Sequence, residues 1–276
     1  MYRFLIISLL FILPITANAN VPEKEAQKHL TSAEDAIGSV VSNYAFTDQD
    51  GKAFELKEFF GKPFIVSFIY TSCPSICPTI LGNLNNAIKK TGQGFGRDFN
   101  ILTISFDETN DTPERLKAYG SRFTDDFTRW RFATADKKTI EILTKEFGFY
   151  YKKQGNFFDH MNMVSIVDSK ARLFSNIYGI DFKPEDVLSP LTEAIKNPDA
   201  KPVKKAFKRQ WWNPFVDTVK LFCSTYNPVT KTYDFDIARL IGIIISGGTI
   251  LTIFFFVWGR DIKYFVSRKF LGRLSR

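Results

Sequence analysis

The sequence predicts an α/β fold, with a central mixed sheet flanked by helices, followed by one transmembrane helix near the C-terminus. Short apolar strands alternate with helix-start signals between residues 43 and 195, which is typical of a sheet covered by helices. Two pairs of these strands are separated only by turn residues, which makes the sheet mixed. An uncharged apolar run from Leu240 to Trp258 predicts the membrane helix.

The first half of the domain is expected to contain a hairpin, a strand, a helix and a second strand. The hairpin lies within Asn43–Leu56, around the turn signal at residues 48–51. Phe64–Tyr70 is an apolar strand, and Pro78 starts the following helix, because proline is tolerated in the first helical turn. The next strand is Asn100–Phe106.

The second half is expected to begin with another helix. Thr112 is suited to the N-cap and Pro113 to the first helical position. The remaining elements are a helix capped by Asp136 and ending near Gly148, a hairpin of Met163–Val167 with Arg172–Ile177, and a last helix from Pro184 to Ile195.

The segment from Tyr70 to Pro78 is chemically the most informative, because it contains two of the three cysteines, Cys73 and Cys77. Two thiols four residues apart at the start of a helix lie where unpaired N–H groups and the helix dipole stabilise a thiolate. The CxxxC spacing leaves room for a metal ion between the sulfur atoms and also permits a disulfide. A structural disulfide or a packed core pair is the alternative without a functional role.

Phe68–Pro78 resembles the stretch F-x-Y-T-x-C-P-x-x-C-P of the SCO/SenC family, the thioredoxin-fold copper-binding proteins that assemble cytochrome c oxidase. The resemblance extends over Val41–Ile195 and implies a thioredoxin-like fold for this domain. One departure is Glu108, where the family usually has proline, and it affects loop geometry more than metal chemistry. The other matches follow in the family's order: Gly61-Lys62-Pro63, Ser105-Phe106-Asp107, Asp111-Thr112-Pro113 and Asp159-His160.

The resemblance implies that His160 joins Cys73 and Cys77 in a copper site. A lone histidine near a strand is more often a hydrogen-bonded or solvated residue than a ligand. His29, in a charged N-terminal stretch, is expected to be solvated. Two thiolates and one imidazole favour Cu(I), with Cu(II) accessible when a further ligand or water joins. Structural zinc normally takes four protein ligands, and the sequence offers no evident fourth.

Two carboxylates, Asp107 and Asp111, are expected beside this site. Asp111 and its two successors are also explained as the start of a helix. The resemblance places their loop next to the copper ligands. These carboxylates are therefore expected to affect partner binding or the electrostatics of the site without contacting the metal.

The two ends of the chain predict export and a membrane anchor. Phe4–Ile15 is a short apolar stretch behind Arg3, and residues 17–19 form an A-x-A cleavage signal, so residues 1–19 are predicted to be a signal peptide. Leu240–Trp258 is uncharged over 19 residues. At 1.5 Å per residue it spans about 28 Å, close to the roughly 30 Å hydrocarbon core of a bilayer.

Charge predicts the orientation of this anchor. Residues 260–276 carry a net charge of +5, so the positive-inside rule places them in the cytoplasm and the folded domain in the periplasm, attached to the inner membrane. Of the formal +8, five units lie in this tail and one is Arg3, which leaves +2 for everything between. Most of the net positive charge therefore lies in the tail after the predicted membrane helix, where it sets the orientation. No nucleic-acid partner is expected.

The chain is therefore divided into five parts. After the signal peptide come the SCO-like domain, a basic and aromatic juxtamembrane linker, the transmembrane helix and the cytoplasmic tail. The linker either lies on the anionic membrane surface or is an ordinary charged connection, and its Cys223 either pairs with a partner or stays unreacted. The boundaries are 1–19, 20–200, 201–236, 237–259 and 260–276.

These inferences predict a copper chaperone rather than an enzyme. Copper held by Cys73, Cys77 and His160 would pass by ligand exchange to the binuclear copper centre of cytochrome c oxidase subunit II. Other periplasmic copper chaperones or thiol reductases are further expected partners. The alternative is a periplasmic thiol-disulfide reductase that uses Cys73 and Cys77 to keep the cysteines of that centre reduced. The CxxxC spacing permits both functions, and His160 favours copper.

Overall fold

The computed structural model describes residues 20–155, 157–204, 224–227 and 232–235, together with short stretches between residues 237 and 258. The chain divides into two compact units, Met1–Arg209 and Gln210–Arg276. The predicted signal peptide, the cytoplasmic tail, much of the juxtamembrane linker and Cys223 lie outside the described residues.

A seven-stranded mixed sheet forms the centre of the first unit, in the order β2-β1-β5-β4-β3-β8-β9. β3 pairs parallel with β4 and antiparallel with β8. Every residue of β3 and β8 is buried, as expected for strands covered on both faces. The strands are β1 Ala45–Asp48, β2 Ala53–Glu55, β3 Phe64–Ile69, β4 Asn100–Ser105, β5 Trp130–Thr134, β8 Met163–Val167 and β9 Leu173–Tyr178.

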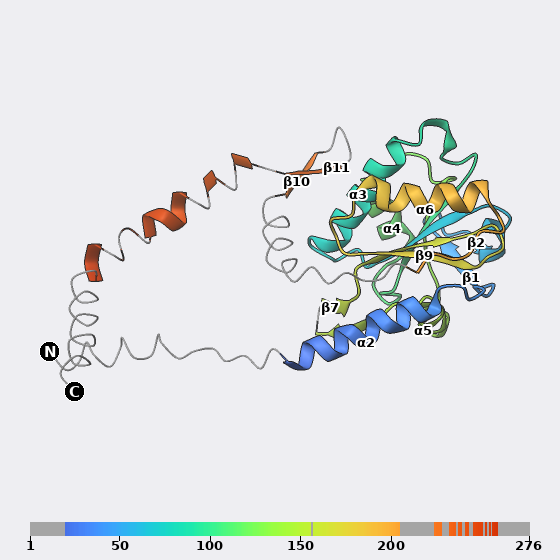
Figure 1. Ribbon diagram of the computed structural model, residues 1–276, viewed down its shortest axis with the longest axis horizontal. Coiled ribbons are helices and arrows are strands. Elements are labelled where there is room, and N and C mark those ends of the chain that lie inside the picture. The colour runs from blue at the N-terminus through green and yellow to red at the C-terminus, as the bar shows by residue number, and fades with distance from the viewer. Residues whose placement is uncertain are drawn as a thin grey trace. The chain divides into compact units, whose positions relative to one another are not determined.

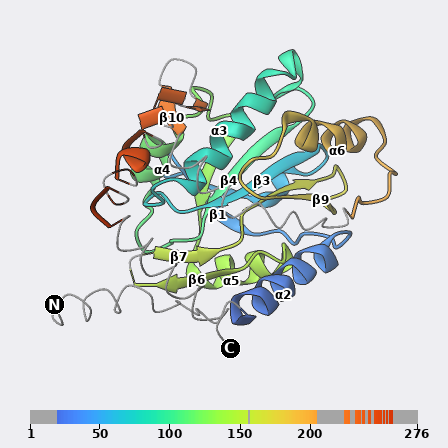
Figure 2. The same cartoon turned by 60° about the vertical axis from the view of Figure 1, so that its left-hand side comes forward.

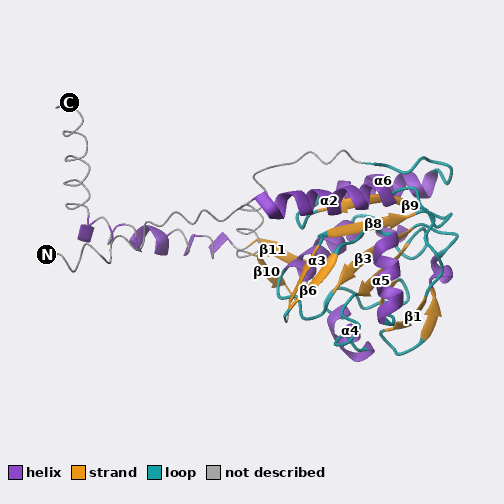
Figure 3. Ribbon diagram, turned by 90° about the horizontal axis from the view of Figure 1, so that it is seen from below, coloured by secondary structure: helices purple, strands orange, loops and turns teal. Residues whose placement is uncertain are grey.

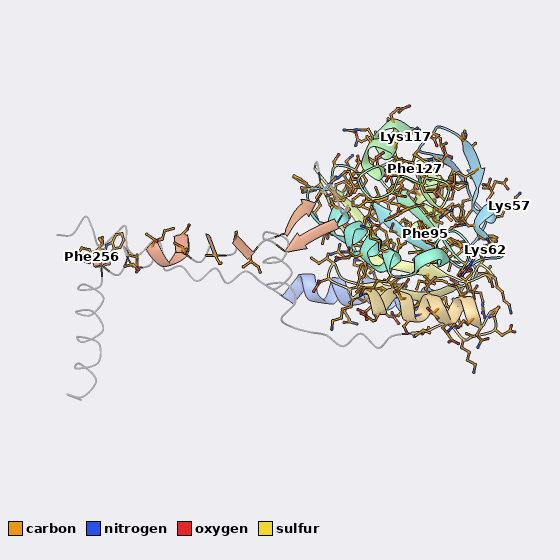
Figure 4. All side chains as sticks on the ribbon, turned by 90° about the horizontal axis from the view of Figure 1, so that it is seen from above. Lys57, Lys62, Phe95, Lys117, Phe127 and Phe256 are labelled. Atoms are coloured by element: carbon orange, nitrogen blue, oxygen red, sulfur yellow. The ribbon has the colours of Figure 1, made fainter. Side chains whose placement is uncertain are left out.

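Helices cover both faces of this sheet and enclose its strands (Figures 1 and 3). α3 and α6 pack together over one face, and α2 and α5 lie over the other (Figure 2). Exposed lysines such as Lys57, Lys62 and Lys117 lie on the outside of the unit (Figure 4). The helices are α2 Asn20–Ala36, α3 Ile76–Lys89, α4 Pro113–Gly120, α5 Lys137–Glu146 and α6 Pro184–Lys196, with short 3-10 helices η1 Leu56–Phe59 and η2 Gly92–Gly94.

The helix-start signals in the sequence act as predicted. The hydroxyl of Thr112 accepts a hydrogen bond from the N–H of Arg115, and Pro113 is the first residue of α4. The carboxylate of Asp136 accepts from the N–H of Thr139 at the start of α5. Both side chains satisfy backbone donors that have no partner within the helix.

The sequence did not predict β5, nor the hairpin of β6 Tyr151–Gln154 and β7 Phe157–His160. In β5, Arg131 follows the buried Trp130 and interrupts the apolar pattern; its guanidinium lies over the ring of Phe54, 4.3 Å from the centroid. β6 and β7 form a separate two-stranded sheet with mostly exposed residues. β5 therefore depends on a tertiary contact that a local pattern does not reveal, whereas Gly155-Asn156 between β6 and β7 is a local hairpin signal.

In the second unit, the structure describes an antiparallel hairpin of β10 Ser224–Asn227 and β11 Thr232–Phe235. No helix among the described residues has both the length and the apolar character that crossing a bilayer requires. Part of the predicted span, Leu240–Trp258, lies outside those residues. The transmembrane helix therefore stays a prediction.

Candidate metal centre

Cys73 lies in the loop between β3 and α3, and Cys77 lies in the first turn of α3. The helix begins at Ile76, two residues earlier than predicted from Pro78. The proline occupies the third helical position, where an N–H would have no partner within the helix, so its missing donor costs nothing. The N–H of Cys73 donates to the carbonyl oxygen of Tyr70 at 3.1 Å, which makes the loop a tight turn.

The start of α3 also contacts the first cysteine directly. The backbone N–H of Cys77 donates to the Sγ of Cys73 at 3.3 Å. Because the N-terminus of a helix carries partial positive charge, this contact stabilises a thiolate on Cys73. Both side chains are buried, with Cys73 6% exposed and Cys77 1% exposed.

His160 is the last residue of β7 and approaches the cysteines from a hairpin far along the chain. It pairs with Tyr151 across that hairpin. Its Nδ1 lies 3.1 Å from the carbonyl oxygen of Met161, so a proton on Nδ1 leaves Nε2 available as a ligand. A carbonyl partner of this kind fixes both the tautomer and the orientation of a metal-binding imidazole.

The two sulfur atoms of Cys73 and Cys77 and a ring nitrogen of His160 all lie within 4.8 Å of one another. In the part of the chain that the structure describes, this is the one cluster of three metal-ligating side chains at such distances. Two thiolate sulfurs and one imidazole nitrogen suit Cu(I). A structural zinc site uses four protein ligands, and this cluster offers three.

The two cysteines differ in acidity. A hydrogen bond from the Cys77 side chain lowers the pKa of the Cys73 thiol, and contacts with His160 and nearby backbone N–H groups add to this effect against the opposing effect of burial. Burial, followed by the neighbouring Cys73, raises the pKa of the Cys77 thiol. In the reduced, metal-free site at neutral pH, Cys73 is therefore the thiolate and Cys77 is the thiol.

Aromatic rings from three separate segments surround the imidazole of His160. Its ring centroid lies 5.8 Å from that of Tyr70, 5.5 Å from that of Phe106 and 6.4 Å from that of Phe149. Such contacts restrict the orientation of the imidazole and place apolar surface beside the ligands. Burial also raises the pKa of Tyr70, so its hydroxyl stays protonated beside Cys73.

Asp111 holds the loop that precedes Cys73. Its carboxylate is 1% exposed and accepts hydrogen bonds from the N–H of Thr71 at 2.8 Å and from the hydroxyls of Thr71 and Ser105. Burial raises the pKa of Asp111 in spite of these donors. Neither Asp111 nor Asp107 belongs to the ligand cluster, so Asp111 acts on the site through the loop.

The structure corrects the expectation for His29. This side chain is half-buried rather than solvated, and its ring stacks on that of Tyr150 with centroids 3.6 Å apart and planes at 15°. The sequence pattern missed this contact because the two residues belong to distant segments.

All three predicted ligands come together in the structure, but the sequence analysis missed the rings around His160. Tyr70 and Phe106 lie within two of the five stretches that carry the family resemblance, so those stretches contained a usable signal. Phe149 follows the end of α5 with no motif around it. Its position depends on a contact with a distant segment, because its ring stacks on that of Phe68 in β3 with centroids 4.6 Å apart.

Comparisons with known proteins agree with this geometry. The SCO1 protein homolog of Bacillus subtilis (strain 168) is 26% identical over 166 residues, which cover 58% of this chain and 86% of the relative. Among solved structures, Bradyrhizobium japonicum ScoI with copper bound is 28% identical with a TM-score of 0.50, over 56% of this chain and 99% of that structure. BsSco is described as a member of the Sco family of cytochrome c oxidase assembly proteins with a disulfide switch. It is 27% identical with a TM-score of 0.52, over 58% of this chain and 95% of BsSco.

The chain also matches the model of a whole protein family. The SCO1/SenC family model matches residues 32–196, which is more than half of the chain and includes the complete ligand cluster. The solved Sco structures share the mixed sheet with flanking helices, which confirms the predicted thioredoxin-like fold. This chain belongs to the SCO1/SenC family.

Proposed function

We propose that this protein binds copper through Cys73, Cys77 and His160 and supplies it for the assembly of cytochrome c oxidase. The observation that carries the proposal is the convergence of two sulfur atoms and one ring nitrogen within 4.8 Å. This set of soft donors suits Cu(I) and accommodates Cu(II) when a further ligand joins. The copper-bound ScoI structure and the description of BsSco as an oxidase assembly protein support the proposal.

Within this proposal, the recipient is the binuclear copper centre of subunit II, and transfer is a ligand exchange. Copper with three protein ligands keeps a position open to a cysteine thiolate of the recipient. A bond from that thiolate to copper forms as a bond to Cys73 or Cys77 breaks, and copper keeps its oxidation state. Because the pKa of Cys77 is raised, this sulfur takes up a proton on release, which favours departure of the metal.

The proposed location follows from the two ends of the chain. Residues 1–19 would direct export, and residues 237–259 would anchor the protein in the inner membrane with the folded unit in the periplasm. The uncharged run Leu240–Trp258 and the net charge of +5 after it support this orientation. The copper site would then face the periplasm.

A second candidate function is thiol-disulfide reduction of the recipient's cysteines, and the lowered pKa of Cys73 favours it. The Cys73 thiolate would attack a disulfide of the recipient and form a mixed disulfide. Cys77, once deprotonated, would displace the recipient's second thiolate and close a Cys73–Cys77 disulfide. The recipient gains two electrons, and an external dithiol reductase must then reduce this protein again.

A variant of His160 separates the two functions, because copper binding requires the imidazole as a ligand, whereas the lowered pKa of Cys73 depends more on Cys77 than on His160. We expect His160→Ala to abolish oxidase assembly in cells grown at ordinary copper, while the protein folds and its Cys73–Cys77 pair still cycles between dithiol and disulfide. Cys73→Ser serves as the reference that damages both functions. Full oxidase activity with His160→Ala would reject copper delivery and favour the reductase.

A further inference from the structure

The N-terminal helix α2 packs against the segment that leads into the hairpin carrying His160. Gly148 has a left-handed backbone (φ +64°), and a Cβ at this position would lie 2.5 Å from the Cα of Ala33 in α2. Ala33 is fully buried, and its carbonyl oxygen accepts a hydrogen bond from the Asn176 side chain in β9 at 2.9 Å. α2 is thus fixed to the main sheet at Ala33, the residue that also lies next to Gly148 in the segment before β6.

One residue of α2 contacts this segment with a ring. His29 lies four residues before Ala33, on the same face of the helix. Its imidazole stacks on the ring of Tyr150, the residue immediately before β6, with centroids 3.6 Å apart. His29 precedes the residues 32–196 that match the family model, so membership of the family does not account for this contact.

Tyr150 connects the stack to the proposed ligand. Its carbonyl oxygen accepts the N–H of Met161 at 2.9 Å, which closes the hairpin directly beside His160. Its hydroxyl lies 3.5 Å from a carboxylate oxygen of Asp159. Met161 in turn supplies the carbonyl oxygen that lies 3.1 Å from Nδ1 of His160. Asp159 and Met161 lie on either side of His160 in the sequence, and Met161 carries the carbonyl group that orients the imidazole. The positions of both residues therefore depend on Tyr150.

We propose that His29 is a positioning residue for the copper site. Its stack on Tyr150 holds the β6–β7 hairpin so that His160 stays within reach of Cys73 and Cys77. The inference rests on the copper-binding function proposed above. Because the contact is ring against ring, the aromatic plane is required, and another aromatic residue can replace it.

The test compares three variants of the full chain, purified reduced and free of metal. His29→Ala removes the ring, His29→Phe retains a ring, and Lys28→Ala changes an exposed neighbour on the same helix as the control. Hydrogen exchange of the amides at residues 151–160 reports on the hairpin without any metal. Competition titration with Cu(I) reports on the site, and the absorption band of the Cu(II)-loaded protein reports on ligand geometry.

We expect faster exchange in the hairpin of His29→Ala than in the wild type, with unchanged exchange in β8. Its copper affinity should fall about tenfold. Loss of a group that orients a metal ligand lowers metal affinity by roughly 10–100-fold, and His29 acts through Tyr150, so the lower end is expected. His29→Phe should restore both properties, and Lys28→Ala should resemble the wild type. Unchanged exchange and affinity in His29→Ala, or a Phe variant as impaired as the Ala variant, would overturn the inference. Failure of the wild-type chain to bind copper would instead reject the proposed function, and the exchange data would still decide whether His29 holds the hairpin.

Discussion

The backbone N–H of Cys77 donates a hydrogen bond to the Sγ of Cys73 at 3.3 Å, and the two cysteines are chemically unequal. The pKa of Cys73 is lowered, chiefly by the side chain of Cys77, whereas burial raises the pKa of Cys77. The metal-free site therefore holds one thiolate and one thiol at neutral pH. Binding of a metal by both sulfurs then releases the proton of Cys77.

The first prediction concerns the acidity of Cys73. Its thiolate absorbance in the ultraviolet should persist at pH values well below about 8.5, where an ordinary cysteine titrates. Cys77→Ala should raise the pKa of Cys73, because the largest cause of its lowering is removed, and Cys77→Ser should raise it less, because a hydroxyl donor remains. Cys73→Ser assigns the signal. A wild-type protein in which all thiols titrate near the ordinary value would contradict the proposed inequality.

The second prediction concerns the hydrogen bonds that the carboxylate of Asp111 accepts from Thr71 and Ser105. Asp111→Ala leaves the N–H of Thr71 and the hydroxyl of Ser105 without their acceptor, and each buried unsatisfied group costs about 1–3 kcal/mol. Asp111→Asn keeps one side-chain oxygen and should cost less. Denaturant unfolding of the metal-free protein measures the loss, with the exposed Asp35→Asn as the control for charge. An Asp111→Ala protein as stable as the wild type would show that the fold does not depend on these hydrogen bonds.

The third prediction concerns the contact of α2 with the entrance to the hairpin. Gly148 and Gly155 have nearly the same backbone, with φ values of +64° and +62°, but only Gly148 has atoms in the way of a Cβ. Gly155→Ala should cost about 1–2 kcal/mol from backbone strain alone. Gly148→Ala should cost a further 1–3 kcal/mol, roughly, because the Cβ forces α2 away. Equal losses of unfolding free energy in the two variants would mean that α2 is not packed there.

The fourth prediction concerns topology. A reporter that is active only in the cytoplasm should work when fused after Arg276 and fail when fused after Lys201, because the basic residues follow the apolar run. The two fusions differ only in the segment between these positions, so each is the other's control. The reverse pattern of activity would reject both the proposed location and the proposed recipient.

The sequence predicted those elements whose signals are local. Thr112 and Asp136 cap their helices as expected, and the buried strand β3 follows from its run of apolar residues, which only Ser67 interrupts. The β6–β7 hairpin was missed because its mostly exposed residues show no apolar alternation, although Gly155-Asn156 between the two strands is a local turn signal. β5 was missed because the partner of Arg131, the ring of Phe54, comes from a distant segment. A window of neighbouring residues contains no trace of such partners.

The candidate site was predictable to a similar degree. The spacing of Cys73 and Cys77 indicates a metal or redox site by itself, but nothing local distinguishes His160 from a solvated histidine. Its assignment came from the family resemblance, and the distances within the cluster now support it. The hydrogen bond from Thr71 to Asp111 and the stacking of His29 on Tyr150 join distant segments of the chain. Only the folded structure reveals such contacts.

The central claim is that the three converging side chains bind copper, and competition titration with Cu(I) tests it most directly. The full reduced chain should bind a single copper at this cluster. His160→Ala should lower the affinity by about 100-fold or more, since loss of a partner that merely orients a ligand already costs roughly 10–100-fold. Lys152→Ala, an exposed change on the same hairpin, should leave the affinity unchanged. A wild-type chain that takes up no copper, or a His160→Ala chain that binds it as tightly as the wild type, would contradict the account.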